Sequence, residues 1–274
     1  MDEFRGRVAV VTGGAGGIGG AMARAFAERG AKLVLADVNE EALARAEKEH
    51  RERGTPVLAV PTDVTKRESV LALADAAVKH FGAAHLVCNN AGIAILGPIE
   101  QTTPEDWEFT MAVNFWGVLY GVQAFLPILR AQRQGGHLVN TASMAGLVGM
   151  AYFSAYNASK FAVVGLSECL HRELKPEGIG VSVLCPMIVR TGLGENTQRL
   201  RSGARGIAAP APEPPAAESM VGGVKQPDEV AERVVRGIER KELYILTHEE
   251  QREILRRRAE RLDAVFEPGR WEIA

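Results

Sequence analysis

Short apolar runs alternate with amphipathic stretches along most of the chain. The apolar runs are rich in β-branched residues and lie at 8–11, 32–36, 57–61, 85–88, 137–141, 181–185 and 244–246. Between them, apolar residues recur every three or four positions, which is the period of an α-helix. The pattern therefore predicts strands that alternate with helices, followed by a charged helix over 249–266.

Strands separated by helices pair in parallel through right-handed crossovers. The pattern therefore predicts an α/β fold of the doubly wound Rossmann type, with about seven parallel strands and helices on both faces. In such sheets, ligands bind at the carboxyl ends of the strands. The residues expected at these ends are Asp37, Asp63, Asn90, Ser143 and Pro186.

Two regions depart from the alternation. Residues 192–226 have low hydrophobicity and several prolines, and such a long connection is unusual in a compact domain. It is either a substrate lid or a disordered segment, and its exit from a ligand-side strand end favours the lid. Residues 248–274 are predicted to be a helical appendage, and the whole of 1–274 a single domain.

Composition is that of an ordinary globular protein. Of the 274 residues, 46% are hydrophobic and 24% charged, and the net charge is −2, which gives no reason to expect nucleic acid as a partner. No signal segment or uninterrupted apolar run of membrane-spanning length is present, so a cytoplasmic protein is expected. The three cysteines, Cys88, Cys169 and Cys185, are expected to be buried, reduced thiols. The histidines show no metal-ligand spacing.

A glycine-rich segment, residues 12–19, follows the first predicted strand. Glycines at a strand-to-helix turn let the backbone approach a pyrophosphate, which the free N–H groups at the helix start attract. Tight packing alone could also explain such a turn. The glycines fit a dinucleotide-binding turn in two registers, which are Gly14, Gly16, Gly19 and Gly13, Gly17, Gly19.

Asp37 ends the second predicted strand, eighteen residues beyond Gly19. At this distance a carboxylate meets the adenosine ribose hydroxyls in dinucleotide folds, which favours cofactor binding over packing. The carboxylate would repel a 2′-phosphate, and Val38 carries no compensating charge. Arg45 is expected to lie too far along the next helix. The sequence therefore favours NAD over NADP.

Tyr156 and Lys160 are four residues apart in a predicted helix, so their side chains share one face. An ammonium about 5 Å from a phenolate stabilises it by on the order of 3 kcal/mol at an effective dielectric constant of 20. We therefore expect Lys160 to supply most of the lowering of the Tyr156 pKa, and a positively charged nicotinamide ring the remainder. The spacing is common by chance, so it gains meaning only from its surroundings.

Four segments occur in a particular order, namely Thr12-Gly13-x-x-x-Gly17-x-Gly19, Asn89-Asn90-Ala91-Gly92, Ser143 and Tyr156-x-x-x-Lys160. In this order and at these separations they resemble the single-domain short-chain dehydrogenase/reductase family. The resemblance covers residues 5–191 densely and the rest loosely. It selects the Gly13, Gly17, Gly19 register and implies one dinucleotide-binding catalytic domain that assembles into a homotetramer or dimer.

The resemblance also implies roles for individual residues. Tyr156 would be the general acid/base, Lys160 would lower its pKa and bind the nicotinamide ribose, and Ser143 would hydrogen-bond the substrate oxygen. Asn114 matches the helix asparagine that holds a proton-relaying water. The cofactor-binding positions would be Gly13, Gly16, Gly17, Ile18, Gly19, Asp37, Val38, Asp63, Val64, Asn90, Ala91, Gly92, Tyr156, Lys160, Pro186, Val189 and Thr191. Three nearby residues match no catalytic position and are expected to be pocket wall or helix surface, namely Tyr152, Ser154 and Ser159.

The substrate pocket is expected to be apolar. Met187 stands where the family usually has glycine, and its flexible side chain would shape the pocket near the nicotinamide. No arginine clamp for a carboxylate or phosphate is evident, which favours a bulky secondary alcohol or ketone, aromatic or alicyclic. Residues 243–248 are loosely similar to family members that oxidise benzylic alcohols of lignin-derived aryl ethers. The candidate pocket residues are Ile93, Ile95, Leu96, Met144, Leu147, Met150, Tyr152, Phe153, Met187 and Leu193.

Taken together, these features predict an NAD-dependent oxidoreductase with a small-molecule substrate and no metal, nucleic acid or membrane partner. Two alternatives remain at this point, an NADP-linked ketone reductase and a dinucleotide-binding regulator without turnover. The presence of the full set of polar residues, Asn114, Ser143, Tyr156 and Lys160, counts against the regulator.

Overall fold

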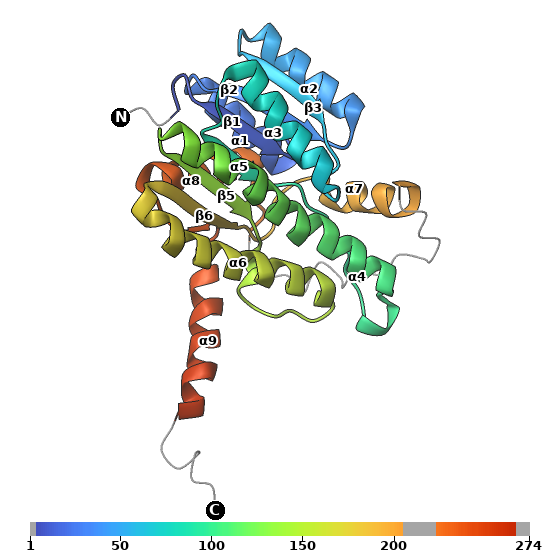
Figure 1. The fold of residues 1–274 in the computed structure, drawn as a ribbon. Helices are drawn as coiled ribbons and strands as arrows, with labels where there is room; N and C mark the ends of the chain where they lie inside the picture. The colour runs from blue at the N-terminus through green and yellow to red at the C-terminus, as the bar shows by residue number, and fades with distance from the viewer. Residues whose placement is uncertain (1–3, 205–222, 267–274) are drawn as a thin grey trace, which may run out of the picture.

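Seven parallel strands form the centre of the molecule (Figure 1). The computed structural model describes residues 4–204 and 223–266. The strands pair in the order β3-β2-β1-β4-β5-β6-β7, which confirms the predicted Rossmann-type sheet. Their bounds are Val8–Thr12 (β1), Lys32–Asp37 (β2), Val57–Pro61 (β3), Leu86–Asn89 (β4), Gly136–Thr141 (β5), Ile179–Cys185 (β6) and Tyr244–Leu246 (β7).

The strand order reverses between β1 and β4. The chain moves outward from β1 to β3 and then crosses back, so that β4 pairs with the other side of β1. Such a switch point leaves a crevice at the carboxyl ends of the two strands, where ligands bind. The glycine-rich segment after β1 and Asn90 after β4 therefore lie at the same place.

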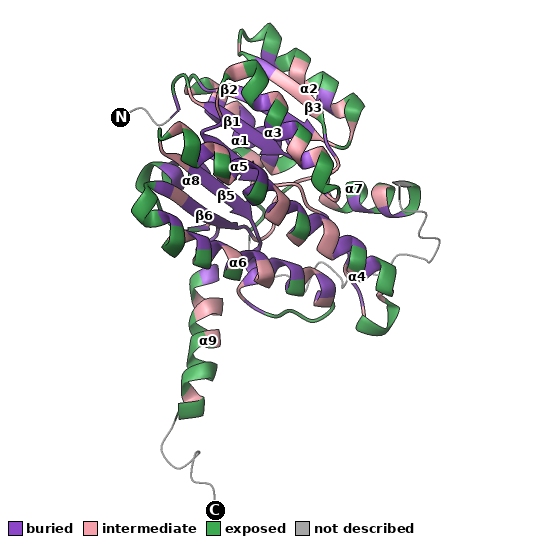
Figure 2. Cartoon of the chain, in the orientation of Figure 1, coloured by how far each residue is buried: buried purple, intermediate pink, exposed green. Residues whose placement is uncertain are grey.

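Helices cover both faces of the sheet. Alternate residues of β1 face opposite ways, because Val10 packs with α3 and α5 while Val11 packs with α1 and α8. The sheet is therefore buried on both sides (Figure 2). The helices are α1 (Gly17–Glu28), α2 (Glu40–Glu52), α3 (Arg67–Phe81), α4 (Pro104–Met111), α5 (Gly117–Gln132), α6 (Ser154–Leu174), α7 (Leu193–Arg199), α8 (Pro227–Arg240) and α9 (Gln251–Asp263).

Helix α8 was not predicted from the sequence. It packs beside α1, and two ion pairs, the exposed Arg24–Asp228 and the partly buried Arg29–Glu232, join α8 to α1 and its C-cap. The local signals were present, since Pro227 stands at its first turn and Gln226 with Glu229 forms a capping box. They were overlooked because they follow directly on the proline-rich segment.

Helices α4 and α5 are continuous through one π-helical turn, Ala112–Trp116. The resulting stretch, Pro104–Gln132, is long and apolar enough to cross a membrane by length and composition alone. Half of its most apolar window is buried inside the protein, as in a helix that flanks a sheet. The π-turn matters for the site, because Asn114 lies within it.

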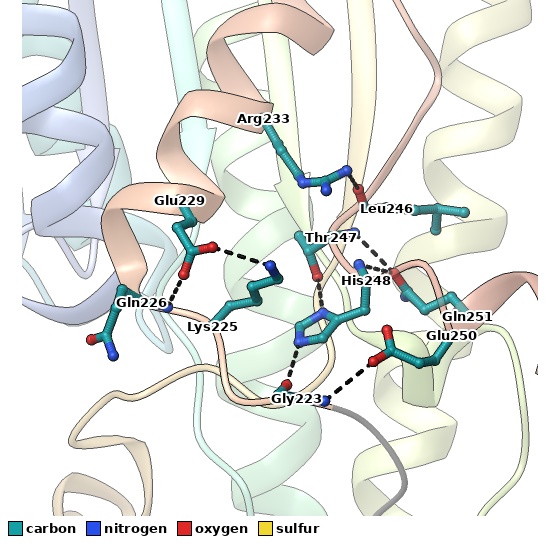
Figure 3. A network of polar contacts seen from close by, with 10 residues as sticks. All are labelled: Gly223, Lys225, Gln226, Glu229, Arg233, Leu246, Thr247, His248, Glu250 and Gln251. Atoms are coloured by element: carbon teal, nitrogen blue, oxygen red, sulfur yellow. Dashed lines mark hydrogen bonds and ion pairs between the residues drawn. The ribbon is translucent and has the colours of Figure 1, made fainter.

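A polar network fastens the start of α9 to the body (Figure 3). The Gln251 side chain accepts hydrogen bonds from the N–H groups of Thr247 and His248, both at 2.9 Å. The His248 ring bonds the Gly223 carbonyl oxygen at 2.9 Å, and Glu250 accepts from the Gly223 N–H. The rest of α9 projects from the body (Figure 1), and residues 267–274 of the predicted appendage lie outside the described residues.

The expectation of three buried thiols is wrong for one cysteine. Cys88 and Cys185 are buried, and burial raises the pKa of each thiol to about 12. Cys169 is exposed, because it lies on the side of α6 that faces away from the sheet.

His137 on β5 is buried and neutral. Ser182 Oγ donates to the Glu242 carbonyl oxygen at 2.5 Å and bonds His137 Nε2 at 2.8 Å. Because the Ser182 hydroxyl proton is donated to the Glu242 carbonyl oxygen, the hydrogen between Ser182 Oγ and His137 Nε2 belongs to the histidine, and Nε2 is the donor. Burial lowers the pKa of His137 to about 3.

We expect His137 to make the fold sensitive to acid. Between about pH 6.5 and pH 3 the unfolded chain binds a proton that the folded chain does not, so stability falls as the pH falls through this window. From pH 7 to pH 5 this residue should cost about 2 kcal/mol of unfolding free energy. Urea unfolding at pH 7 and pH 5 measures this loss of unfolding free energy. In His137→Leu the loss between the two pH values should be smaller than in the wild type by that amount. Leu138→Ala, which lowers stability without removing a titratable group, should keep the wild-type pH dependence. An unchanged dependence in His137→Leu would contradict the argument.

Candidate active site

The glycine-rich segment forms the turn between β1 and α1. Gly13 and Gly17 have positive φ values of 63° and 53°, a region that favours glycine. A Cβ on Gly19 would lie 2.1 Å from the Gly13 carbonyl oxygen, so only glycine lets the helix start against the turn. Gly16 caps α1 without a side-chain bond. The first N–H groups of the helix therefore remain available to an anion such as a pyrophosphate.

Thr12 and Asn90 join the ends of β1 and β4 beside this turn. Thr12 Oγ1 accepts from the N–H groups of Asn90 and Ala91 at 2.9 and 3.1 Å. Asn90 Nδ2 donates to the Thr12 carbonyl oxygen at 3.0 Å. These bonds hold residues 90–92 next to the glycine turn. The sequence did not predict this role for Thr12, although Thr12 opens the glycine motif.

Asp37 holds the glycine turn from the end of β2. Its Oδ2 accepts from the Ala15 N–H at 3.2 Å and its Oδ1 from the Asn39 N–H at 3.0 Å. Arg45 lines the same cavity as Asp37, so the expectation that it lies too far along the helix is wrong. The difference arises because α2 begins at the edge of the cavity, directly after Asn39.

A cavity of about 470 Å³ runs along the carboxyl ends of the strands. Gly19 supports the turn without lining the cavity. Further lining residues that were not singled out lie next to predicted ones, including Ala15, Asn39, Thr62, Thr65, Thr141 and Ala142. The predicted cofactor residues that line it are Gly13, Gly16, Gly17, Ile18, Asp37, Val38, Asp63, Val64, Asn90, Ala91, Gly92, Tyr156, Lys160, Pro186, Val189 and Thr191.

Ser143, Tyr156 and Lys160 line this cavity together. Ser143 follows the end of β5, and α6 carries the other two on one face. Lys160 Nζ lies 5.6 Å from the centroid of the Tyr156 ring and donates to the Thr141 carbonyl oxygen at 2.9 Å. Ser143 Oγ accepts from the Ala145 N–H at 3.1 Å, which sets its position at the strand end.

Burial governs the pKa values of the tyrosine and the lysine. It raises the pKa of the Tyr156 phenol above its ordinary value, and a hydrogen bond with Ser143 lowers it by less. Burial also lowers the pKa of Lys160 to about 8. The expected lowering of the Tyr156 pKa by Lys160 is not seen, because both groups lose solvation in the same cavity. Among the described residues no carboxylate pairs with Lys160.

Asn114 lies behind the cavity wall. Its Oδ1 accepts from the Ile93 N–H at 2.9 Å, and its Nδ2 donates to the Ile93 carbonyl oxygen and to Ser159 Oγ, both at 3.0 Å. A Cβ on Gly92 would lie 3.3 Å from Asn114 Oδ1 and 3.5 Å from Lys160 Nζ, so the asparagine and the lysine are close neighbours. Ser159 is fully buried. Its assignment to pocket wall or helix surface was therefore wrong.

The apolar part of the cavity differs from the expected one. Met187 and Leu193 line it, together with Ile93, Phe109, Val113 and Leu200. Ile95 and Met144 are instead buried in the protein, and Met150 is 36% exposed outside the cavity. Arg199 also lines the cavity, so one arginine is present where the sequence analysis saw none. It comes from α7, which lies at the start of the predicted lid, while residues 205–222 of the lid lie outside the described residues.

Met144 supports the site from behind. Its sulfur accepts a hydrogen bond from Gln251 Nε2 at 3.4 Å, and the same Nε2 donates to the Cys185 carbonyl oxygen at 2.8 Å. Met144 follows Ser143 in the chain, and Cys185 precedes Pro186. The first turn of α9 therefore braces both segments that frame the catalytic end of the cavity.

Known proteins share this architecture. A family model described as short chain dehydrogenase matches residues 7–201. A solved short-chain dehydrogenase/reductase from Burkholderia phymatum in complex with NAD is 39% identical, covers 96% of both chains and has a TM-score of 0.88. An alcohol dehydrogenase from the archaeon Thermococcus sibiricus complexed with 5-hydroxy-NADP is 28% identical, covers 88% of this chain and 96% of its own, and has a TM-score of 0.73. The C alpha-dehydrogenase of Sphingobium sp. strain SYK-6 is 35% identical over 257 residues, which are 92% of this chain and 84% of its own length.

The matched residues include the glycine turn, the strand ends and the segment with Tyr156 and Lys160. The similar structures hold NAD in one case and an NADP analogue in the other. The resemblance read from the sequence is therefore confirmed, and the chain belongs to the short-chain dehydrogenase/reductase family of NAD(P)-dependent oxidoreductases.

Proposed function

We propose that the protein is an NAD-dependent oxidoreductase that interconverts a hydrophobic secondary alcohol and its ketone. The observation that carries the proposal is the meeting of three groups at the cavity that begins at the glycine turn. These groups are the Tyr156 phenol, the Ser143 hydroxyl and the buried Lys160 ammonium. A phenol beside a hydroxyl can hold and protonate or deprotonate one substrate oxygen.

The residues present fit the cofactor. The glycine turn and the uncapped start of α1 would hold its pyrophosphate, Asp37 the adenosine ribose and Lys160 the nicotinamide ribose. NAD, when bound, supplies the acceptor for a hydride. Tyr156 in its phenolate form takes the alcohol proton and becomes the neutral phenol, and Ser143 donates to the substrate oxygen as negative charge builds there. Burial raises the pKa of Tyr156, and the positive charges of Lys160 and of a bound oxidised nicotinamide would act against this effect and favour the phenolate.

The substrate class follows from the apolar wall. Ile93, Met187, Leu193 and Leu200 favour a bulky, uncharged carbon skeleton, aromatic or alicyclic. The polar exception, Arg199, is exposed on α7 and could contact a substrate with an acidic group at the edge of the cavity.

A panel of hydrophobic secondary alcohols and their ketones tests the function directly. With NAD and an alcohol, NADH absorbance should rise, and with NADH and the matching ketone it should fall. A substrate that carries a carboxylate should be included because of Arg199. Failure to turn over any member in either direction would overturn the proposal.

An NADP-linked reaction is the second candidate, because Arg45 lines the cavity beside Asp37. We expect NADH to bind more tightly than NADPH, since the Asp37 carboxylate repels a 2′-phosphate. Asp37→Ser should shift the ratio of the two dissociation constants towards NADPH by on the order of 100-fold. Fluorescence titration with each cofactor measures the ratio. Arg45→Ala should weaken NADPH binding in the Asp37→Ser background and leave NADH binding nearly unchanged. Tighter binding of NADPH by the wild type would refute the role of Asp37.

Three further expectations belong to this proposal. A homotetramer or dimer would cover exposed apolar side chains such as Trp116, which is 44% exposed, and light scattering tests it. We also propose a cytoplasmic location and the organisation of 1–274 as one catalytic domain. Cell fractionation and limited proteolysis test these two.

A further inference from the structure

Ser159 links the catalytic helix to the π-helical turn. Its hydroxyl donates to the Tyr156 carbonyl oxygen at 2.7 Å and accepts from Asn114 Nδ2 at 3.0 Å. The residue is fully buried and does not line the cavity. Its immediate neighbour in the chain is Lys160.

Both N–H donors of the Asn114 amide are used, one by this contact and one by Ile93. Its other two bonds, from Nδ2 to the Ile93 carbonyl oxygen and from the Ile93 N–H to Oδ1, hold the backbone that follows Gly92. Ser159 is therefore the point at which this asparagine is bonded to α6. The Ser159 hydroxyl therefore fixes the relative positions of three segments, which are the segment after β4, the π-turn and the helix of Tyr156.

Serine suits this place because a hydroxyl both donates and accepts. The Ser159 proton goes to a carbonyl of its own helix, which leaves an oxygen lone pair directed to Asn114. Alanine at this position would leave one N–H of a fully buried amide without its acceptor on α6. A buried amide in that state moves or draws in water, because its desolvation is no longer compensated.

Two turns further along α6, Ser167 makes the same pattern of bonds. It is also fully buried, donates to the Val163 carbonyl oxygen at 2.7 Å and accepts from Asn140 Nδ2 at 3.0 Å. Ser167 joins α6 to β5 and does not line the cavity. The two serines therefore make the same kinds of hydrogen bond. Only Ser159 lies next to the reacting groups.

We propose that Ser159 is a positioning residue for proton transfer, which sets the place of Tyr156 and Lys160 relative to Asn114. This inference rests on the proposed function of Tyr156 as the acid/base group. Proton transfer depends steeply on the distance and angle between the groups. A buried bond that fixes the first turns of α6 therefore controls the rate without touching substrate or cofactor.

Ser159→Ala and Ser167→Ala form a matched pair for the test. Each variant loses the two buried hydrogen bonds of one serine hydroxyl. The melting temperatures of the two variants should therefore fall by similar amounts, about 2–6 °C. Ser159→Ala should lower kcat for alcohol oxidation about tenfold and change its pH profile, with the KM for NAD within about twofold. Ser167→Ala should keep kcat within about twofold, and Ser159→Thr, which restores the hydroxyl, should recover most of the rate.

Equal kcat values in the two alanine variants would overturn the proposal. A measurement that needs no turnover separates this outcome from failure of the proposed function. Carbon-13 NMR of the tyrosine Cζ atoms, with Tyr156→Phe for assignment, follows the titration of the Tyr156 phenol. In Ser159→Ala its pKa should move towards the ordinary value, because a loosened helix lets solvent reach the phenol, and in Ser167→Ala it should not move. An unchanged titration in Ser159→Ala would overturn the inference even if no substrate is found.

Discussion

Tyr156→Phe is expected to reduce alcohol oxidation by about 10³- to 10⁴-fold, while NADH still binds with nearly the wild-type dissociation constant. Phenylalanine keeps the ring beside Lys160 and removes only the hydroxyl. The cavity and the glycine turn are unaffected, so the cofactor keeps its contacts. What is lost is the group that exchanges a proton with the substrate oxygen, together with its hydrogen bond to Ser143.

Single-turnover kinetics and NADH fluorescence titration, performed on the same preparation, measure the two quantities separately. Tyr120→Phe removes a phenol on α5 that does not line the cavity and should retain full activity. Retention of turnover in Tyr156→Phe would refute the role of Tyr156 as the acid/base group. Loss of NADH binding along with turnover would instead indicate a structural defect.

The same variant distinguishes an enzyme from a dinucleotide-binding regulator. A regulator needs the glycine turn and Asp37 and has no use for the phenol. Oxidation of alcohols from the panel by the wild type, together with no oxidation by Tyr156→Phe, would therefore exclude the regulator.

Arg201→Met is expected to lower the free energy of unfolding by about 3–5 kcal/mol, the largest stability effect among these variants. Arg201 and Asp106 form a buried pair with two bonds, from Nε to Oδ1 at 2.7 Å and from Nη2 to Oδ2 at 3.0 Å. Both side chains are at most 2% exposed. Without the guanidinium, the Asp106 carboxylate remains in the interior with its charge uncompensated.

The pH dependence of this defect has a definite sign. In the wild type, burial tends to raise the pKa of Asp106, but the bonds from Arg201 and Thr103 and the charge of Arg201 outweigh it and hold the pKa below its usual value. In Arg201→Met only burial and the Thr103 bonds still act on the Asp106 carboxylate. The pKa of Asp106 is therefore higher than in the wild type, and the folded state accepts a proton there more readily. The defect should therefore shrink as the pH is lowered from 7 towards 4.

Urea unfolding at several pH values measures these changes. Arg130→Met is the matched control, because Arg130 also makes two bonds to one carboxylate, that of Glu177, but on the exposed surface. Its change in stability should be far smaller, since solvent already screens the pair. Replacement of Asp106 by Asn in the Arg201→Met background should recover part of the loss. Equal effects of Arg201→Met and Arg130→Met would contradict the argument.

The strands and the binding edge could be predicted because their signals are local. A β-branched run followed by a glycine turn or a single polar residue specifies a strand and its end within a few positions, as at Val11 and Asp37. Helix α8 carried equally local signals, Pro227 and its capping box, and was missed because the proline-rich segment before it suggested that regular structure had ended.

The substrate end of the cavity could not be predicted in the same way. Ile95 and Met144 are apolar and lie near the strand ends, yet their side chains turn into the protein. Which way a side chain points in an irregular segment depends on the segments packed against it. For Met144 that neighbour is Gln251, more than a hundred residues further along the chain.

Local patterns in the chain specify which groups share a face or a turn. Tyr156 and Lys160 lie together because a helix repeats every 3.6 residues, and the glycines allow the backbone path from β1 to α1. The tertiary structure alone decided that Arg45 and Arg199 reach the cavity, that Ser159 bonds Asn114, and that burial, more than the neighbouring charge, governs the pKa values of Tyr156 and Lys160. These properties depend on distances between segments far apart in the chain and on the loss of water around them, and no local pattern encodes either.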